Sequence, residues 1–339
     1  MRAMASPRKR RRLLVEGESA VYHVMSRTAL KRYLLGPKEK EVFCALLRQQ
    51  ADFCGVEVLT FCVMGNHFHI LARVAPVRSM PDEELLRRYT DYYGEGAVPR
   101  SVWSPEELRT ILANGGHRAE HARKRILDRM GNLPAFMREL KQRFTIWFNA
   151  RHGNDGTVWG ARYKSVLVED EVETLAKVSA YIDLNPVRAG IAGDPADYRW
   201  CGYAQAVAGL REARQGVVGL FASDPRTYAD AMRHYRLVLF GKGYLAKGTP
   251  GKDEGRVSAE KLQQVIDSGG ELSLQELLRV RWRYFADGMI LGSKAFLDKQ
   301  FAGNRDLFGR KRKRLGRRLP GNAWNGLHVA RDLKINVFS

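Results

Sequence analysis

The sequence predicts an α+β protein: a ferredoxin-like (split βαβ) antiparallel sheet with helices on one face, followed by a mostly helical, basic C-terminal domain. Three observations support this fold class. Strand and helix patterns follow in the order β-α-β-β-α-β-α over residues 20–190, close to the order of a split βαβ unit. Two strand patterns flank a Gly-Asn pair typical of a hairpin. The helix patterns carry one apolar face each.

Alternation and turn signals place the first half of the sheet. Residues 20–28 ("AVYHVMSRT") alternate and are rich in β-formers, which predicts the first strand. Residues 36–55 predict an amphipathic helix that begins near a proline and ends at a glycine. The hairpin strands are expected on either side of Gly65-Asn66, at residues 56–64 and 67–74.

Helical patterns dominate the second half of the unit. Residues 76–133 are polar and helix-prone with Pro and Gly breaks, and they indicate an insertion. A long helix is expected at 134–153 and a fourth strand at 163–170. A further core helix is expected at 171–190. It must loosen before Pro186, because the residue before a proline disfavours helical geometry.

Composition divides the chain into a basic N-terminal arm (1–17), a domain with the sheet (18–210) and a basic helical domain (211–339), in which residues 241–256 have the composition of a linker. The net charge is +20 and the pI about 10.0. Such an excess favours a polyanionic partner, most often nucleic acid. A basic surface that only keeps the protein in solution is the alternative.

Other features narrow the class of protein. The four cysteines form no CxxC pair and there is no signal-peptide pattern, so a reduced, cytoplasmic setting is the simplest expectation. No apolar run approaches the roughly 20 residues that a membrane span needs.

The C-terminal domain carries aromatic residues and a basic run that suit DNA stacking and backbone contact: Trp282, Tyr284, Phe285 and residues 310–318. A helix-turn-helix around "ADGMILGS" (residues 286–293) is one interpretation. A solvated helical appendage or an oligomerisation arm are the others.

Two histidines separated by one residue stand in the second hairpin strand. Side chains in a strand alternate between faces, so His67, His69 and Arg73 are expected on one face and the apolar Phe68 and Ile70 on the other. Neutral imidazoles on one face can bind a divalent metal. A pair of hydrogen-bonded, partly buried histidines fits the same pattern.

The helix at 171–190 adds further polar groups. Tyr181 and Asn185 are four residues apart and share one helix face, and Lys177 lies on that face one turn earlier. Tyr181 could also be a half-buried helix tyrosine, and Asn185 a residue that caps the helix end. His23, in the first strand, is expected to be structural.

These motifs together resemble a known family. "GNHFHIL", "SAYIDLNPVRAG" and "DYRWCGY", with "YHVMSRT" and "GARYKSVLVED" in support, resemble the REP-associated tyrosine transposases, within the single-tyrosine HUH transposases. The resemblance covers roughly residues 18–205. It does not include the insertion or the C-terminal extension.

The resemblance implies a function and a site. By correspondence of motifs, His67, His69 and Asn185 would bind Mg²⁺ or Mn²⁺, and Tyr181 would be the nucleophile. The family cleaves and rejoins single-stranded DNA next to palindromic hairpins, through a 5′-phosphotyrosine intermediate. We expect the same of this chain, as a cytoplasmic, nucleoid-associated protein of bacterial type, monomer or homodimer, that contacts no membrane.

Basic residues are candidates for phosphate or DNA contact. Near the expected site these are Arg73 and Lys177, and in the two basic runs they are Arg8, Lys9, Arg10, Arg11, Arg12, Arg310, Lys311, Arg312, Lys313, Arg314, Arg317 and Arg318. Two rival functions remain open: a catalytically silent regulator that binds hairpin DNA on the same fold, and an RNA-binding module that uses aromatic residues on the sheet face.

Overall fold

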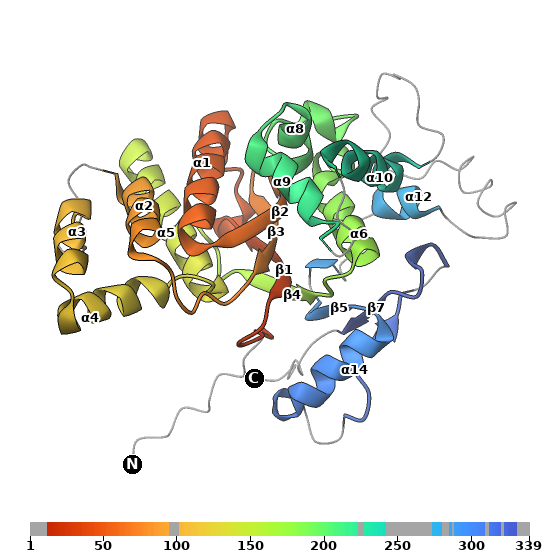
Figure 1. Cartoon of the computed structure of the whole chain (residues 1–339). Helices are drawn as coiled ribbons and strands as arrows, with labels where there is room; N and C mark the ends of the chain where they lie inside the picture. Colours follow the sequence, from red (N-terminus) through yellow and green to blue (C-terminus); the bar gives the residue numbers. More distant parts are fainter. Residues whose placement is uncertain are drawn as a thin grey trace, which may run out of the picture.

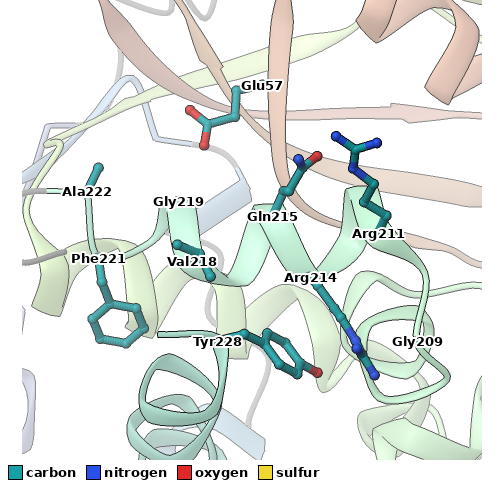
Figure 2. A pocket seen from close by; sticks show the side chains of 10 residues that line it. All are labelled: Glu57, Gly209, Arg211, Arg214, Gln215, Val218, Gly219, Phe221, Ala222 and Tyr228. Carbon is teal, nitrogen blue, oxygen red and sulfur yellow. The ribbon is translucent and has the colours of Figure 1, made fainter. Parts of the chain in front are cut away.

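The computed structural model describes residues 12–94, 102–222, 227–241, 273–279, 285–286, 288–308, 312–319 and 322–330. A sheet runs through its centre (Figure 1), and four of its strands form the predicted unit: β1 (Ala20–Arg27), β2 (Val56–Val63), β3 (His67–Val74) and β4 (Lys164–Val168). They lie in the order β2-β3-β1-β4 and all pairs are antiparallel. This is the ferredoxin-like arrangement, and the predicted fold class is confirmed.

Two helices cover one face of these strands, as predicted. They are α1 (Pro37–Cys54) and α5 (Leu133–His152). Their apolar sides pack on the side chains of β3 that include Phe68 and Ile70. Helix α1 begins with a proline in its first turn and ends at Gly55, which adopts the left-handed conformation (φ 62°) that glycine tolerates best.

The insertion after β3 is helical. It contains α2 (Asp82–Tyr93), α3 (Pro105–Asn114) and α4 (Gly116–Leu127), which lie beyond α1 and α5 on the same side of the molecule (Figure 1). Tyr92 stacks on Phe53 of α1, with the ring centroids 4.3 Å apart, and donates a hydrogen bond to Gln50. The insertion therefore shares the core of α1 and α5.

Helices after β4 cover the opposite face. They are α6 (Val172–Asp183), α7 (Asn185–Arg188), α8 (Gly202–Val207), α9 (Arg211–Gly219) and α10 (Tyr228–Phe240). They pack on side chains of β1, β3 and β4 that include Val21, Leu71 and Val166. The β1–β4 strands thus have helices on both faces, α1 and α5 on one and these five on the other. As predicted, the helix is interrupted before Pro186, between α6 and α7.

A buried carboxyl group anchors the end of α6. Asp183 accepts hydrogen bonds from the hydroxyls of Thr60 in β2 and Tyr235 in α10, and from the backbone N–H of Tyr203 in α8. Burial raises the pKa of Asp183 to about 7, against the lowering effect of these donors. One side chain therefore joins α6 to three other elements.

The C-terminal residues extend the same sheet. They contribute α12 (Leu274–Arg279), β5 (Ile290–Gly292), α14 (Lys294–Gly303), β6 (Arg317–Arg318) and β7 (His328–Ala330). In the described residues the sheet has seven strands in the order β2-β3-β1-β4-β5-β7-β6, with β5 parallel to β4. Segments on both sides of residue 210 share one sheet, while the domain boundary there stays a prediction.

The helix-turn-helix interpretation is wrong. Its turn was expected around residues 286–293, but Ile290–Gly292 form strand β5, which pairs with β4 on one side and β7 on the other. A run of three buried residues fits a strand between two other strands as well as it fits part of a helix-turn-helix. Periodicity alone does not distinguish these two structures.

The free edge of β2 is closed by the chain that precedes α8. The backbone N–H of Val63 donates to the carbonyl of Trp200 (3.0 Å), and the hydroxyl of Tyr198 donates to the carbonyl of Val63 (2.8 Å). Next to them, the backbones of Cys62 and Cys201 pair in an isolated antiparallel β-bridge. Helix α9 also approaches β2 closely. A Cβ atom at Gly216 would lie 2.6 Å from the carbonyl oxygens of Val58 and Leu59.

The four cysteines are buried and none forms a disulfide, in agreement with their expected role in the core. Of the helices that the structure describes, none combines the length and the apolar character that crossing a membrane requires.

Candidate active site

Strand β3 places the two histidines as the alternation predicts. His67 and His69 lie on the face of the sheet that packs against α6, opposite to Phe68 and Ile70. Their ring centroids are 5.2 Å apart, with an interplanar angle of 85°. His67 is half-buried and His69 is 2% exposed.

A third histidine joins this pair. The Nδ1 atom of His69 lies 2.8 Å from Nε2 of His23 in β1, and Nδ1 of His23 lies 2.8 Å from the carbonyl oxygen of Phe285. Burial lowers the pKa of His23 to about 4, and burial next to His23 and His67 lowers the pKa of His69 well below its ordinary value. Both shifts favour the neutral form of the ring.

His67 is held by the turn that precedes it. Its Nδ1 atom lies 2.7 Å from Oδ1 of Asn66, and the amide nitrogen of Asn66 donates to the carbonyl of Lys31 (3.1 Å). The hairpin turn, with Asn at this position, thus also orients a site residue.

Helix α6 brings Tyr181 to the histidines. The tyrosine ring lies 6.4 Å from the ring of His69 and 6.3 Å from that of His23, measured between centroids. Tyr181 is 2% exposed. The ring of Phe285 stacks on it at 4.8 Å, and the guanidinium of Arg188 lies 4.1 Å from its centroid.

Asn185 lies at the junction of α6 and α7. Its amide nitrogen donates to the carbonyls of Ile182 (3.0 Å) and Tyr181 (3.4 Å), which have lost their helical partners at the end of α6. The side chain of Asn185 thus caps the end of α6, which is one of the two roles that the sequence predicts for it. The amide oxygen is then the atom suited to coordination.

The side chains near Tyr181 include donor types that suit a divalent cation. In the described residues no group of three or more His, Cys, Asp or Glu side chains could hold a metal ion. The predicted ligands are of another composition: the imidazoles of His67 and His69 and the amide oxygen of Asn185. Imidazole and oxygen donors suit first-row divalent ions such as Mn²⁺.

Two candidate phosphate contacts are occupied by protein groups. Against the lowering effect of burial, the hydrogen bonds and charges of Asp170 and Glu57 raise the pKa of Arg73, which also donates to the carbonyl of Gly219. Lys177 is 7% exposed and donates to Glu173 and to the carbonyl of Trp324. These contacts do not support phosphate binding by either residue, and that role stays a prediction.

The basic runs are described only in part. Arg8, Lys9, Arg10, Arg11, Arg310 and Lys311 lie outside the described residues, as do Trp282 and Tyr284. Arg12 lies over the ring of Tyr163, at 3.7 Å. Arg312 lies over that of Phe308, at 5.8 Å. The exposed members of the second run are Lys313, Arg314, Arg317 and Arg318. Phe285 is fully buried against Tyr181, so its predicted stacking on DNA is wrong for this conformation.

Sequence reasoning missed four residues of the site: His23, Asn66, Arg188 and Phe285. In β1, His23 pairs with Leu71 of β3, which makes it a diagonal neighbour of His69 on the same face. The sequence shows which face of β1 carries His23, but it does not show how β1 is aligned with β3. Arg188 follows Tyr181 by seven residues, two helical turns, which was a usable signal.

Comparisons with known proteins agree with the motifs. The family model "Transposase IS200 like" matches residues 17–83, which include β1, β2, β3 and both site histidines. No curated protein matches the chain. A solved structure, described as the REP-associated tyrosine transposase bound to a REP hairpin, is similar at 13% identity and a TM-score of 0.36, over 61% of this chain and 87% of that chain. The family match confirms the resemblance to the IS200-like transposases over residues 17–83.

Proposed function

We propose that this protein cleaves and rejoins single-stranded DNA next to hairpins, with Tyr181 as nucleophile. The observation that carries the proposal is that the ring of Tyr181 in α6 lies 6.4 Å from that of His69, which lies 5.2 Å from that of His67 on the same face of the sheet. Asn185 follows Tyr181 by four residues and donates to its carbonyl. The family match over residues 17–83 and the net charge of +20 support a nucleic-acid substrate.

The reaction is a transesterification. The hydroxyl oxygen of Tyr181 attacks the scissile phosphorus and loses its proton, the bond from phosphorus to the 3′ oxygen breaks, and that oxygen leaves as a 3′-OH. The product is a 5′-phosphotyrosine, and attack by a 3′-OH reverses the step without ATP. His67, His69 and Asn185 would hold a Mg²⁺ or Mn²⁺ ion, which would supply Lewis-acid polarisation of the phosphodiester.

Arg188 supplies a second positive charge. Its guanidinium lies over the ring of Tyr181 and donates to the carbonyls of Tyr181 and Leu278. A cation there stabilises the negative charge that accumulates on the attacked phosphate. Since the ring of Phe285 covers the tyrosine, DNA reaches the nucleophile only when residue 285 moves away.

The burial of Tyr181 also favours a second candidate, the catalytically silent hairpin-binding regulator. A tyrosine that stays covered would leave binding without chemistry. The RNA-binding module is less well supported, because its aromatic platform needs an open sheet face and helices pack on both faces of the β1–β4 unit. Whether the protein acts as a monomer or a homodimer stays a prediction.

A denaturing gel separates the two candidates. End-labelled hairpin oligonucleotides with single-stranded flanks are incubated with wild type, Tyr181→Phe and the control Tyr92→Phe, in Mn²⁺ or EDTA. Tyr92 is a buried tyrosine on the other side of the sheet. We expect a Mn²⁺-dependent protein–DNA adduct in wild type and control, and none in Tyr181→Phe. Binding without any adduct would favour the regulator, and an adduct in Tyr181→Phe would exclude Tyr181 as nucleophile.

A further inference from the structure

We propose that His23 is a positioning residue that sets the ring tautomer of His69, so that the Nε2 atom of His69 carries the lone pair. The inference rests on the proposed function only where it assigns that lone pair to a metal ion. The tautomer itself follows from hydrogen-bond donors and acceptors in the buried chain Phe285–His23–His69.

The carbonyl of Phe285 sets the direction of this chain of hydrogen bonds. The carbonyl oxygen of Phe285 can only accept, so Nδ1 of His23 carries a hydrogen and donates to it. A neutral imidazole has one N–H, so Nε2 of His23 accepts. Its partner, Nδ1 of His69, must then be the donor. The single hydrogen of neutral His69 is thereby assigned to Nδ1, and Nε2 is left with the lone pair that a metal ion needs.

The opposite assignment requires a charged His23. A doubly protonated His23 would donate from Nε2 to His69 and move the hydrogen of His69 to its Nε2 atom. That atom could then bind no metal. His23 is 2% exposed, and one of its two ring nitrogens faces a backbone carbonyl while the other faces the imidazole of His69, so no acidic side chain hydrogen-bonds to it to compensate a charged ring in this buried place.

The second histidine is held in the same way by a different partner. The amide nitrogen of Asn66 donates to the carbonyl of Lys31, so its oxygen faces Nδ1 of His67 and accepts a hydrogen bond from it. Neutral His67 then also has its lone pair on Nε2. Two unrelated acceptors thus produce the same tautomer in both candidate ligands, as acceptors behind metal-binding histidines commonly do.

Two substitutions at residue 23 test the inference. His23→Gln retains an amide oxygen to accept from His69 and an amide nitrogen to donate to Phe285. His23→Phe retains a ring but neither nitrogen. Tyr92→Phe serves as the control, because it removes a buried hydrogen bond on the other side of the sheet.

The first readout needs no metal. In ¹⁵N-histidine-labelled, metal-free protein, the ring-nitrogen shifts of His69 report which nitrogen is protonated. We expect Nδ1–H in wild type, His23→Gln and Tyr92→Phe, and a mixture of tautomers in His23→Phe. Protonation of Nε2 in wild type, or an unchanged tautomer in His23→Phe, would overturn the inference.

The second readout is Mn²⁺ affinity, measured by electron paramagnetic resonance of free Mn²⁺ during titration. We expect a loss of about ten- to a hundredfold in His23→Phe, with near wild-type affinity in His23→Gln and Tyr92→Phe. Equal affinity in His23→Phe would overturn the positioning role. Absence of Mn²⁺ binding in wild type with Nδ1–H on His69 would instead overturn the metal step of the proposed function and support the tautomer.

Discussion

Asp183→Asn is expected to remove a large pH dependence of stability. The folded-state pKa of Asp183 is raised from 3.8 to about 7 by burial. A raised pKa means that the folded state binds the proton more tightly than the unfolded state. This contribution to the free energy of unfolding is fully present below pH 3.8 and is lost as the pH rises through about 7. Over the whole window, a shift of about three units corresponds to about 4 kcal/mol.

The magnitude between two accessible pH values is smaller. Between about pH 5 and about pH 8, the linkage relation gives a loss of roughly 2.5 kcal/mol for wild type. Asparagine has nearly the same shape and does not ionise, so Asp183→Asn should not show this loss. The difference in unfolding free energy between variant and wild type should therefore shift in favour of the variant by roughly that amount on going from pH 5 to pH 8.

Urea denaturation of both proteins at the two pH values measures the difference, and the subtraction cancels groups that titrate in both. Thr60→Val is the matched control, because it removes one donor to Asp183 but keeps the carboxyl group. A difference that does not change with pH would refute the reasoning. It would mean that Asp183 is ionised at pH 5 despite its burial.

Three further substitutions have definite expectations. Phe285→Ala uncovers Tyr181 and should increase the initial rate of adduct formation, while the unfolding free energy falls by about 3–5 kcal/mol. A slower rate in folded variant protein would contradict the interpretation that Phe285 shields Tyr181 from DNA. Arg188→Gln should slow adduct formation about a hundredfold with little change in hairpin affinity, as a gel-shift assay would show. Gly216→Ala should lower the unfolding free energy by about 1–3 kcal/mol or more, because its Cβ would meet two carbonyl oxygens of β2; an unchanged urea midpoint would contradict this close contact.

Much of the fold was predictable because its signals are local. Alternation located β1 and β3, the Gly-Asn pair located the hairpin, and proline and glycine located the ends of α1. The strands β5, β6 and β7 have two or three residues each. Such lengths are too short for alternation to be recognised, and their pairing depends on partners far away in the sequence.

The candidate site, like the fold, was predictable only where its signals are local in the sequence. Strand parity placed His67 and His69 on one face, and helical spacing placed Tyr181 near Asn185. The role of Phe285 was not predictable, because it follows Tyr181 by about a hundred residues and nothing local distinguishes a buried stacking partner from a DNA-binding aromatic. His23 has the right parity, but only the register of β1 against β3 shows that it meets His69.

The closed edge of β2 limits how copies of this protein can associate. An exposed strand edge is a template for another strand, and many proteins pair or aggregate through it. Here Val63 already exchanges hydrogen bonds with Tyr198 and Trp200, and the backbone of α9 lies against the carbonyls of Val58 and Leu59. A second copy could extend the sheet at β2 only after displacing these segments, so this edge is closed to the strand-to-strand pairing that open edges allow.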